Sequence, residues 1–354
     1  MRTSTSGPVA TGAASRDVVI CCANEVEPER LAAFYQTMYP GRPMVETWRW
    51  RYHVEEGCEG PPLVAVRNGR VIAHAGGVPF TAETRGQRWR AMWFVDFAVL
   101  PEHQRQGVGI ELTERWMQLS DLHVTFCNEH SIGVFKKFGW VESFDMALHR
   151  LLLRPFDQPR AQRIPPALRS AGNALARVGL KILQQSAAGN AAPELGPVGE
   201  AELQPFLNSS DSSRKNIVRP IRDADYLQWR ILSSPARASY VVCRLDDVAL
   251  LVHTPRIQSS SRLDVLVMSS TGKASFGAIR QMLAWLGLWG LERGFEELRY
   301  FPPNKELSDY LARRLPVAIH RPRFAYHSAG ISLLQQLQAA DWEWQLLDSD
   351  FEWI

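Results

Sequence analysis

The segment Arg105–Gly109, which contains an arginine and two glycines and follows an apolar stretch, is the part of this chain best suited to hold a phosphate. Residues 94–100 are mostly apolar, and an amphipathic helix is expected over 107–119. The first amides of a helix point outward with partial positive charge, so they attract anions. Gly107 and Gly109 lack a Cβ and allow close approach to the main chain, while Arg105 adds a mobile cation.

An acid within the same stretch offers acid–base chemistry. Asp96 alternates with inward-facing neighbours on the expected strand 92–100, so its carboxylate is the first candidate for a general base. Glu25, just after the first expected strand, and His74 are weaker candidates. The alternative role for Asp96 is a structural ion pair with an arginine. Asp264, at the matching place in a second half that has no such glycine turn, supports that alternative, and both stay open.

Elements that position these residues follow from apolar periodicity and turn chemistry. Asn68-Gly69 is the strongest hairpin signal because both residues tolerate positive φ, and a second hairpin is expected around Gly86. The expected order is strand 18–23, helix 28–38, strands 63–66 and 71–75, strand 92–100, helix 107–119, strand 122–127, helix 131–138 and strand 140–148. The fold class predicted is α/β, with a mixed, largely antiparallel sheet and flanking helices.

With these elements in order, residues 18–150 resemble the GNAT superfamily of acyl-CoA N-acyltransferases, most specifically over 92–140. The motif stands as Gln104-Arg105-Gln106-Gly107-Val108-Gly109 after Val99-Leu100-Pro101, followed downstream by Asn128 and by Gly139-Trp140. The resemblance implies a twisted sheet whose strands 92–100 and 122–127 splay apart around the pantetheine arm of acetyl-CoA or another acyl-CoA. It implies no metal. The cofactor-binding residues it implies are Phe97, Ala98, Val99, Gln104, Arg105, Gln106, Gly107, Val108, Gly109, Ile110, Asn128 and Phe135.

One position departs from the family pattern. The family often places a tyrosine in the short helix to protonate the leaving thiolate, and Phe135 stands there in this chain. Asn128, Cys127 or water would then be the donor, or the thiolate leaves without a dedicated acid.

The second half repeats the first faintly. The pair Trp50-Arg51 recurs as Trp229-Arg230, and residues 95–99 resemble residues 263–267, which precede an expected helix at 276–292. Matches in the same order indicate a duplicated unit, with an unrelated α/β domain as the alternative. We therefore expect two GNAT-like domains. The expected boundaries are a disordered tail at 1–16, a catalytic domain at 17–150, a linker at 151–199 and a degenerate copy at 200–354.

The linker contains an amphipathic, basic helix. Apolar residues recur at helical spacing from Ile164 to Ile182, and there is no acid between Asp157 and Glu194. We expect a connecting helix packed on the two domains. The alternative is weak contact of residues 160–185 with an anionic membrane surface.

Charge, cysteine content and hydropathy indicate which partners and which cellular location are expected. The net charge of +3 over 354 residues does not indicate nucleic-acid binding, and the five cysteines include no C-x-x-C pair. No apolar run is long enough to span a bilayer, so a cytoplasmic protein is expected. The closing segment from Asp341 to Trp353 combines acids with tryptophans. We interpret it as a strand sealed by indoles, with sugar stacking as the alternative.

The function predicted is transfer of an acyl group from CoA to a primary amine. This chain has a Trp-Arg-Trp-Arg-Tyr segment before the core and an expected second, degenerate copy. In both respects it resembles bacterial GNATs of polysaccharide or cell-envelope biosynthesis. The resemblance implies an amino-sugar acceptor, free or carrier-linked. One alternative is a FemAB-like enzyme that takes aminoacyl groups from tRNA, although the glycine turn and the modest charge favour CoA. The other is a non-catalytic acyl-CoA sensor or scaffold, which Phe135 makes credible.

Overall fold

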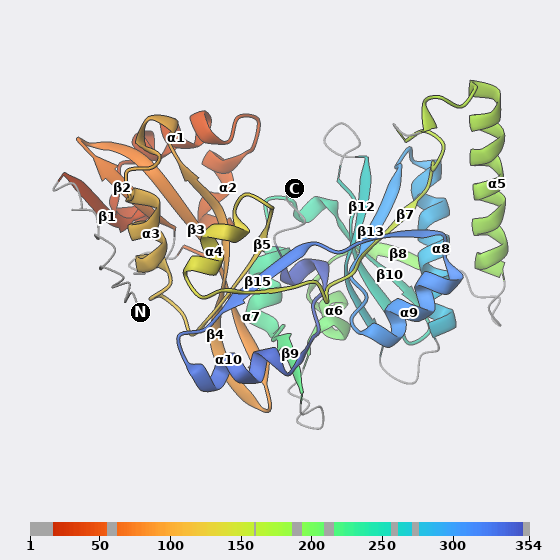
Figure 1. The fold of residues 1–354 in the computed structure, drawn as a ribbon. Helices are drawn as coiled ribbons and strands as arrows, with labels where there is room; N and C mark the ends of the chain where they lie inside the picture. Colours follow the sequence, from red (N-terminus) through yellow and green to blue (C-terminus); the bar gives the residue numbers. More distant parts are fainter. Residues whose placement is uncertain are drawn as a thin grey trace, which may run out of the picture. The chain divides into compact units, whose positions relative to one another are not determined.

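The structure is a computed structural model that describes residues 17–54, 62–158, 161–185, 193–208, 216–255, 261–270 and 276–349 (Figure 1). The expected tail at 1–16, Cys58 and Trp353 lie outside these residues. The chain divides into two compact units, each described here by itself. Unit 1 is Met1–Val78 with Phe94–Ser120, and unit 2 is Pro79–Trp93 with Asp121–Ile354.

Unit 1 holds an antiparallel sheet in the order β1-β2-β3 together with the end of β4. The hairpin between β2 and β3 turns at Asn68 and Gly69, whose φ angles of 50° and 74° confirm the turn predicted from sequence. The elements of unit 1 are β1 (Val18–Cys22), α1 (Pro28–Met38), α2 (Met44–Arg51), β2 (Leu63–Arg67), the start of β3 (Arg70–Thr84), the end of β4 (Gln87–Val99) and α3 (Val108–Trp116).

Helices of unit 1 follow their sequence signals. Pro28 occupies the first turn of α1, where no amide hydrogen is needed, and the helix buries Leu31, Phe34 and Tyr35. The aromatic segment before the core is itself a helix, α2, which buries Trp48 and Arg51. A helix was not expected there because its aromatic and basic residues alternate without a clear apolar stripe.

Unit 2 contains parts of two sheets. In the first, the order is β4-β5-β15-β6, and the end of β3 pairs with β9, which pairs with β16. The second is a seven-stranded sheet in the order β14-β7-β13-β12-β11-β10-β8. Its strands and those of the first sheet are β5 (Leu122–Cys127), β6 (Val141–Ser143), β7 (Leu148–Leu152), β8 (Glu194–Pro197), β9 (Ile217–Pro220), β10 (Tyr240–Leu245), β11 (Val248–His253), β12 (Arg262–Ser270), β13 (Glu297–Tyr300), β14 (Val317–His320), β15 (Arg323–His327) and β16 (Asp341–Trp342).

Both sheets mix parallel with antiparallel pairs, and helices flank them, so the predicted mixed α/β fold is confirmed. The helices of unit 2 are α4 (Ile132–Lys137), α5 (Pro166–Gln185), α6 (Glu200–Leu203), α7 (Ala224–Leu227), α8 (Phe276–Glu292), α9 (Lys305–Arg314) and α10 (Ile331–Gln338). The core of the second sheet lies under α8, where Met282, Leu283 and Leu286 are fully buried.

Strands are exchanged between the two sheets. β7 lies between β13 and β14, and β15 lies between β5 and β6, with every pairing antiparallel. The single closing strand expected at 140–148 is therefore wrong. It is two strands in different sheets, because the Ser143 hydroxyl and the Asp145 carboxylate and amide bond to each other and turn the chain. β7 also runs across the domain boundary expected at residue 150.

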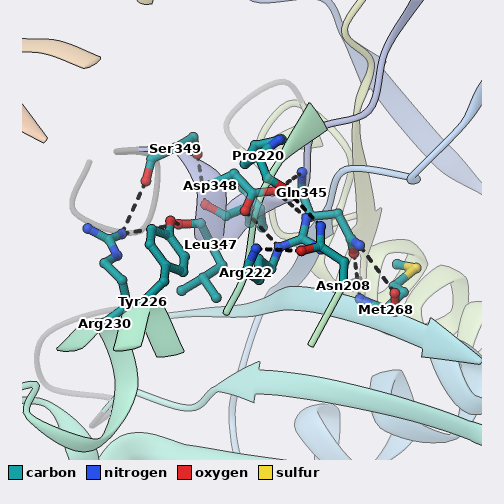
Figure 2. Close-up of polar contacts among 11 residues, drawn as sticks. Asn208, Pro220, Arg222, Tyr226, Arg230, Met268, Gln345, Leu347, Asp348 and Ser349 are labelled. Carbon is teal, nitrogen blue, oxygen red and sulfur yellow. Dashed lines mark hydrogen bonds and ion pairs between the residues drawn. The ribbon is translucent and has the colours of Figure 1, made fainter. Parts of the chain in front are cut away.

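The closing segment of the described chain is pinned by buried polar contacts (Figure 2). Arg222 donates to both carboxylate oxygens of Asp348, at 2.7 Å from Nε to Oδ1, and Gln345 bonds to both main-chain groups of Met268. Trp344 is 2% exposed and packs on Phe80 and Trp93. The segment therefore packs into unit 2 through a buried tryptophan. This agrees with the interpretation of a strand covered by indoles.

Candidate functional site

The turn before α3 is open and leaves main-chain amides free. After a short 3-10 turn at Pro101–His103, Arg105 and Gly107 take positive φ angles of 61° and 86°, and Gly107 caps the helix. The amides of residues 105–109 find no hydrogen-bond acceptor among the described residues. Amides at a helix start attract anions, so this turn in unit 1 has the main-chain donors that an anion site needs.

Two glutamine side chains stabilise this turn by donating hydrogen bonds to nearby main-chain carbonyls. Gln104 Nε2 donates to the carbonyl of Val99 at 3.0 Å, and Gln106 Nε2 donates to the carbonyl of Glu102 at 2.8 Å. Gln106 Oε1 also accepts from Arg67 at 2.9 Å. The two glutamines therefore fix the turn, and their amide groups are not free for a ligand.

Arg105 stands apart from this bracing. Its exposed side chain makes no hydrogen bond or ion pair with any residue that the structure describes. It is thus available as a cation beside the free amides.

Exposed apolar side chains adjoin the turn. Phe97 and Ile110 are both exposed. A Cβ placed on Gly109 would lie 3.1 Å from Phe97 Cζ and 3.4 Å from Val99 Cγ2. The helix start therefore packs directly on the end of β4, and glycine permits that approach. Ala98 and Val99 are half-buried and Val108 is buried.

β4 is irregular at Asp96, where φ is positive and the side chains of Tyr39 and His74 bond the main-chain carbonyl; we call this irregularity the Asp96 bulge. The Asp96 φ of 49° is unusual for a residue with a side chain. Arg51 Nε lies 2.8 Å and the Tyr52 hydroxyl 2.9 Å from Oδ2, and the Asp96 side chain is 5% exposed. The hydroxyl of Tyr39 donates to the Asp96 carbonyl. Bulges bend a strand and re-aim the residues after it, here Phe97 to Val99.

These contacts make the Asp96 carboxylate a weak base. Burial alone would raise its pKa, but the charge of Arg51 and the hydrogen bonds from Arg51 and Tyr52 outweigh burial and hold the pKa below the ordinary value. In unit 2, Asp264 pairs with Arg299 at 2.7 and 2.9 Å. The structure thus favours the ion-pair interpretation of Asp96 over that of proton acceptor.

His74 completes the same cluster as a neutral, fully buried ring. Its Nδ1 lies 2.8 Å from the Asp96 carbonyl, and its Nε2 lies 3.1 Å from the Tyr35 hydroxyl. Burial lowers the pKa of His74 to about 4. Both nitrogens are satisfied, so His74 is a core residue and not an acid–base group.

Glu25 is exposed near the end of β1. Its carboxylate accepts a hydrogen bond of 3.0 Å from the amide of Cys22 and closes the short turn after that strand. The remaining oxygen leaves it available as a proton acceptor in unit 1.

The other predicted site residues belong to unit 2. Asn128 follows β5 and accepts hydrogen bonds of 2.9 Å from the amides of His130 and Ser131, which starts α4. Phe135 is buried against Trp140, with ring centroids 4.8 Å apart, and has no hydroxyl to offer.

Pairing between β4 and β5 is short. Within the described residues it joins Ala91–Trp93 to Leu122–Val124, although β4 continues to Val99 and β5 to Cys127. The ends of β4 and β5 are not paired with each other within the described residues, as is required of two strands that splay apart.

A pocket of about 430 Å³ in unit 2 was not found by sequence reasoning. Its aromatic wall includes Phe301, Trp342 and Trp344, and Phe301 stacks on Phe126 near the end of β5 at 6.2 Å and 15°. Carboxylates outnumber cations on its lining. The carboxylates are Asp145, Glu306, Asp309, Asp341 and Glu343, and the cations are Lys305 and Arg321. Only the mixture of acids and tryptophans in the closing segment signalled it.

Comparison with known proteins gives these features a family context. Residues 28–140 match the acetyltransferase (GNAT) family. No curated protein sequence matches the chain. This GNAT match covers unit 1's free-amide turn, Asp96 and the start of α4.

Solved structures share the fold across both halves of the chain. A GCN5-related N-acetyltransferase from Kribbella flavida is 12% identical, with 88% of this chain and 71% of that one covered and a TM-score of 0.55. N-myristoyltransferase from Saccharomyces cerevisiae, solved with myristoyl-CoA and inhibitors, is 8% identical, with 92% and 86% covered and a TM-score of 0.56. At these identities the likeness establishes the fold alone.

A third structure is the glucosamine N-acetyltransferase region of a fungal multi-domain beta-N-acetylglucosaminidase. It is 13% identical, with 90% of this chain and 39% of that chain covered and a TM-score of 0.50.

Proposed function

We propose that this protein is an acyl-CoA-dependent N-acyltransferase whose CoA diphosphate binds the free amides of residues 105–109. The observation that carries the proposal is the open turn itself, with Gly107 at positive φ, Arg105 unpaired among the described residues, and a GNAT match around it. Free amides and a cation supply donors and positive charge for a diphosphate without further rearrangement.

The apolar end of β4 suits the pantetheine arm. The Asp96 bulge directly precedes Phe97, and the exposed Phe97 ring lies against the start of α3. In this proposal Asp96 is a positioning residue. It holds the bulge through Arg51, Tyr52 and His74 and touches no reacting atom.

The acceptor amine is assigned to the carboxylate-lined pocket of unit 2. Excess negative charge favours an ammonium group, and Trp342 offers a flat apolar face of the kind on which a sugar ring stacks. Phe301 links the pocket wall to Phe126 on β5, the strand that the GNAT resemblance places beside the thioester. An amino sugar fits both features, and the glucosamine N-acetyltransferase region with a similar fold supports that class.

Proton transfer then falls to exposed carboxylates. The amine must lose a proton before or during attack on the thioester carbonyl, and a pocket carboxylate accepts it directly or through water. Phe135 cannot protonate the leaving thiolate, so the thiolate leaves unassisted or takes its proton from water, Cys127 or the Asn128 amide.

We also infer that the two sheets descend from one duplicated unit. In each, a parallel strand pair spanning a helix (β4-α3-β5 and β12-α8-β13) is followed by an antiparallel strand borrowed from the other half. The second copy has no counterpart of the glycine turn, so one CoA per chain is expected.

A non-catalytic acyl-CoA-binding role is the second candidate, favoured by the missing hydroxyl at Phe135 and the paired state of Asp96. A thiol-release assay separates the two. Full-length protein would be incubated with several acyl-CoAs and a panel of amino sugars, polyamines and peptides. Amine-dependent release of CoA supports transfer, whereas tight acyl-CoA binding without release by any amine supports the sensor.

A further inference from the structure

Helix α5 turns its apolar side toward solvent. Leu168, Leu175 and Ile182 are 61%, 72% and 60% exposed, and Val178 is 51% exposed. These residues recur at helical spacing and so form one stripe along the helix, which we call the α5 stripe. A stripe of this kind is normally buried, because each large apolar side chain left in water forgoes its burial free energy.

The opposite side of α5 anchors it to unit 2. The helix packs along α8 (Figure 1), and Leu180 on that side is 2% exposed. Gly172 lies against the ring of Phe156. The helix thus packs on α8 of unit 2, and this packing uses other residues than the α5 stripe.

The charge on α5 is wholly positive. Arg169, Arg177 and Lys181 lie on the helix, and the sequence has no acid from 158 to 193. Arg177 is partly offset by Glu292 on α8 at 3.4 Å, while Lys181 is exposed. Arg169 and Arg177 line a groove with Leu291 of α8, so Lys181 is the cation that flanks the α5 stripe. No helix among the described residues has the length and apolar content to cross a bilayer. A helix with an apolar stripe, an exposed lysine and no acid suits the plane of an anionic interface.

We propose that α5 docks this protein on the surface of an anionic lipid bilayer. The α5 stripe enters the boundary between headgroups and acyl chains, and the exposed Lys181 that flanks it meets lipid phosphates. A second copy of the chain is a poorer occupant, because two α5 helices would bring their cations together with no acid on either helix. The proposal is independent of acyl transfer, and it would bring the enzyme to a carrier-linked acceptor.

Vesicle flotation tests the proposal with the full-length chain. The probes are vesicles of phosphatidylcholine alone and vesicles with about one third phosphatidylglycerol. The test variant is Leu175→Glu/Ile182→Glu, and Lys181→Glu tests the charge. The matched control is Ile331→Glu, which changes a 76% exposed apolar residue on α10.

The wild type and Ile331→Glu should float with the anionic vesicles and much less with neutral vesicles or at high salt. Leu175→Glu/Ile182→Glu should partition at least about tenfold more weakly, because two apolar side chains no longer enter the lipid. Lys181→Glu should weaken binding mainly to the anionic vesicles.

Failure of the wild type to float with anionic vesicles at low salt would overturn the proposal, as would equal flotation of the double variant. Light scattering on the same samples measures whether the protein self-associates. A dimer that Leu175→Glu/Ile182→Glu dissolves, in a protein that binds no vesicles, would assign the α5 stripe to a second copy and would also overturn it.

Discussion

The carboxylate of Asp96 faces Arg51 and Tyr52 inside unit 1, and that pairing decides what the residue can do. Asp96→Asn would leave the guanidinium of Arg51 buried without its counter-charge, since each side chain of the pair is 5% exposed. We expect the free energy of unfolding to fall by about 3–5 kcal/mol. Urea titration of the purified variant measures it.

The control for Asp96→Asn is Glu102→Gln, whose pair with Arg70 is exposed on both sides. That variant should unfold like the wild type. A variant Asp96→Asn of unchanged stability that loses acyl transfer would instead make Asp96 the proton acceptor.

His74 predicts a pH dependence of stability. Its pKa is about 4 in the folded protein against the ordinary 6.5, because burial disfavours the charged ring. The unfolded chain takes up a proton below pH 6.5 and the folded one does not. The stability due to His74 is therefore complete above pH 6.5 and is lost as pH falls toward 4. Asp96, with its lowered pKa, keeps its contribution over this window and loses it only at lower pH.

The measurement is the free energy of unfolding across that window for the wild type and for His74→Gln, which cannot titrate. His123 and His149 also have pKa values lowered to about 4 by burial, so the variant should flatten the pH dependence without abolishing it. Identical slopes for the two proteins would contradict the assignment of a buried neutral His74.

The turn before α3 could be predicted from sequence because its signal is local. Gly107, Gly109 and Arg105 act through main-chain geometry and one free side chain, and both can be read from neighbours in the chain. The partners of Asp96 could not be read that way. Arg51 is the last residue of α2 and Tyr52 follows it, and only the fold shows which acid they meet.

At the scale of elements, the bulge in β4 depends on a close approach from β3. A Cβ on Gly76 would lie 2.6 Å from Tyr52 Cε1 and 2.9 Å from the carbonyl oxygen of Val95. Gly76→Ala must therefore displace Tyr52 from Asp96 or shift β4, at a cost of about 1–3 kcal/mol. The free energy of unfolding measures this cost.

Gly133→Ala is the matched control for Gly76→Ala. No atom lies within 4 Å of a Cβ at that position in α4, so alanine should be neutral or stabilising by up to about 1 kcal/mol. Equal effects of the two variants would mean that the Gly76 contact is not tight.

The pocket proposed for the acceptor is an element-level feature as well, lined by residues of β9, β16 and α9 and of the loops that follow β6, β13, β14 and β16. Asp341→Asn removes one of its carboxylates. We expect a several-fold rise in KM for the amine at unchanged affinity for CoA, since only the attraction for the ammonium is reduced. Glu292→Gln, outside the pocket, should leave KM unchanged. An unchanged KM in Asp341→Asn would place the amine elsewhere.

Most single elements could be predicted from sequence, and the hairpin at Asn68-Gly69 shows why. Turn chemistry and apolar spacing act within a few residues. The exchange of β7 and β15 could not be predicted, because each strand has an ordinary apolar pattern and its partners lie far away in sequence.

At the scale of the whole molecule, that exchange ties the first half of the chain to the last. In the part of the chain that the structure describes, β5 and β6 each pair with β15 and not with each other. A chain ending at residue 199 would lack β15 and expose two strand edges, so we expect it to aggregate or remain unfolded. Circular dichroism and size-exclusion chromatography against the full chain test this. A monomeric, cooperatively folded fragment would contradict the expected dependence on β15.

The central claim is that free amides beside Gly107 bind the diphosphate of CoA, and calorimetric binding of CoA to Gly107→Asp tests it most directly. The control is Gly86→Asp in the β3–β4 hairpin. Both glycines have positive φ, at 86° and 75°, with no atom within 4 Å of a Cβ, so the backbone strain is matched. We predict that Gly107→Asp weakens CoA binding by at least about a hundredfold while Gly86→Asp binds like the wild type. Wild-type affinity in a folded Gly107→Asp variant would contradict the account.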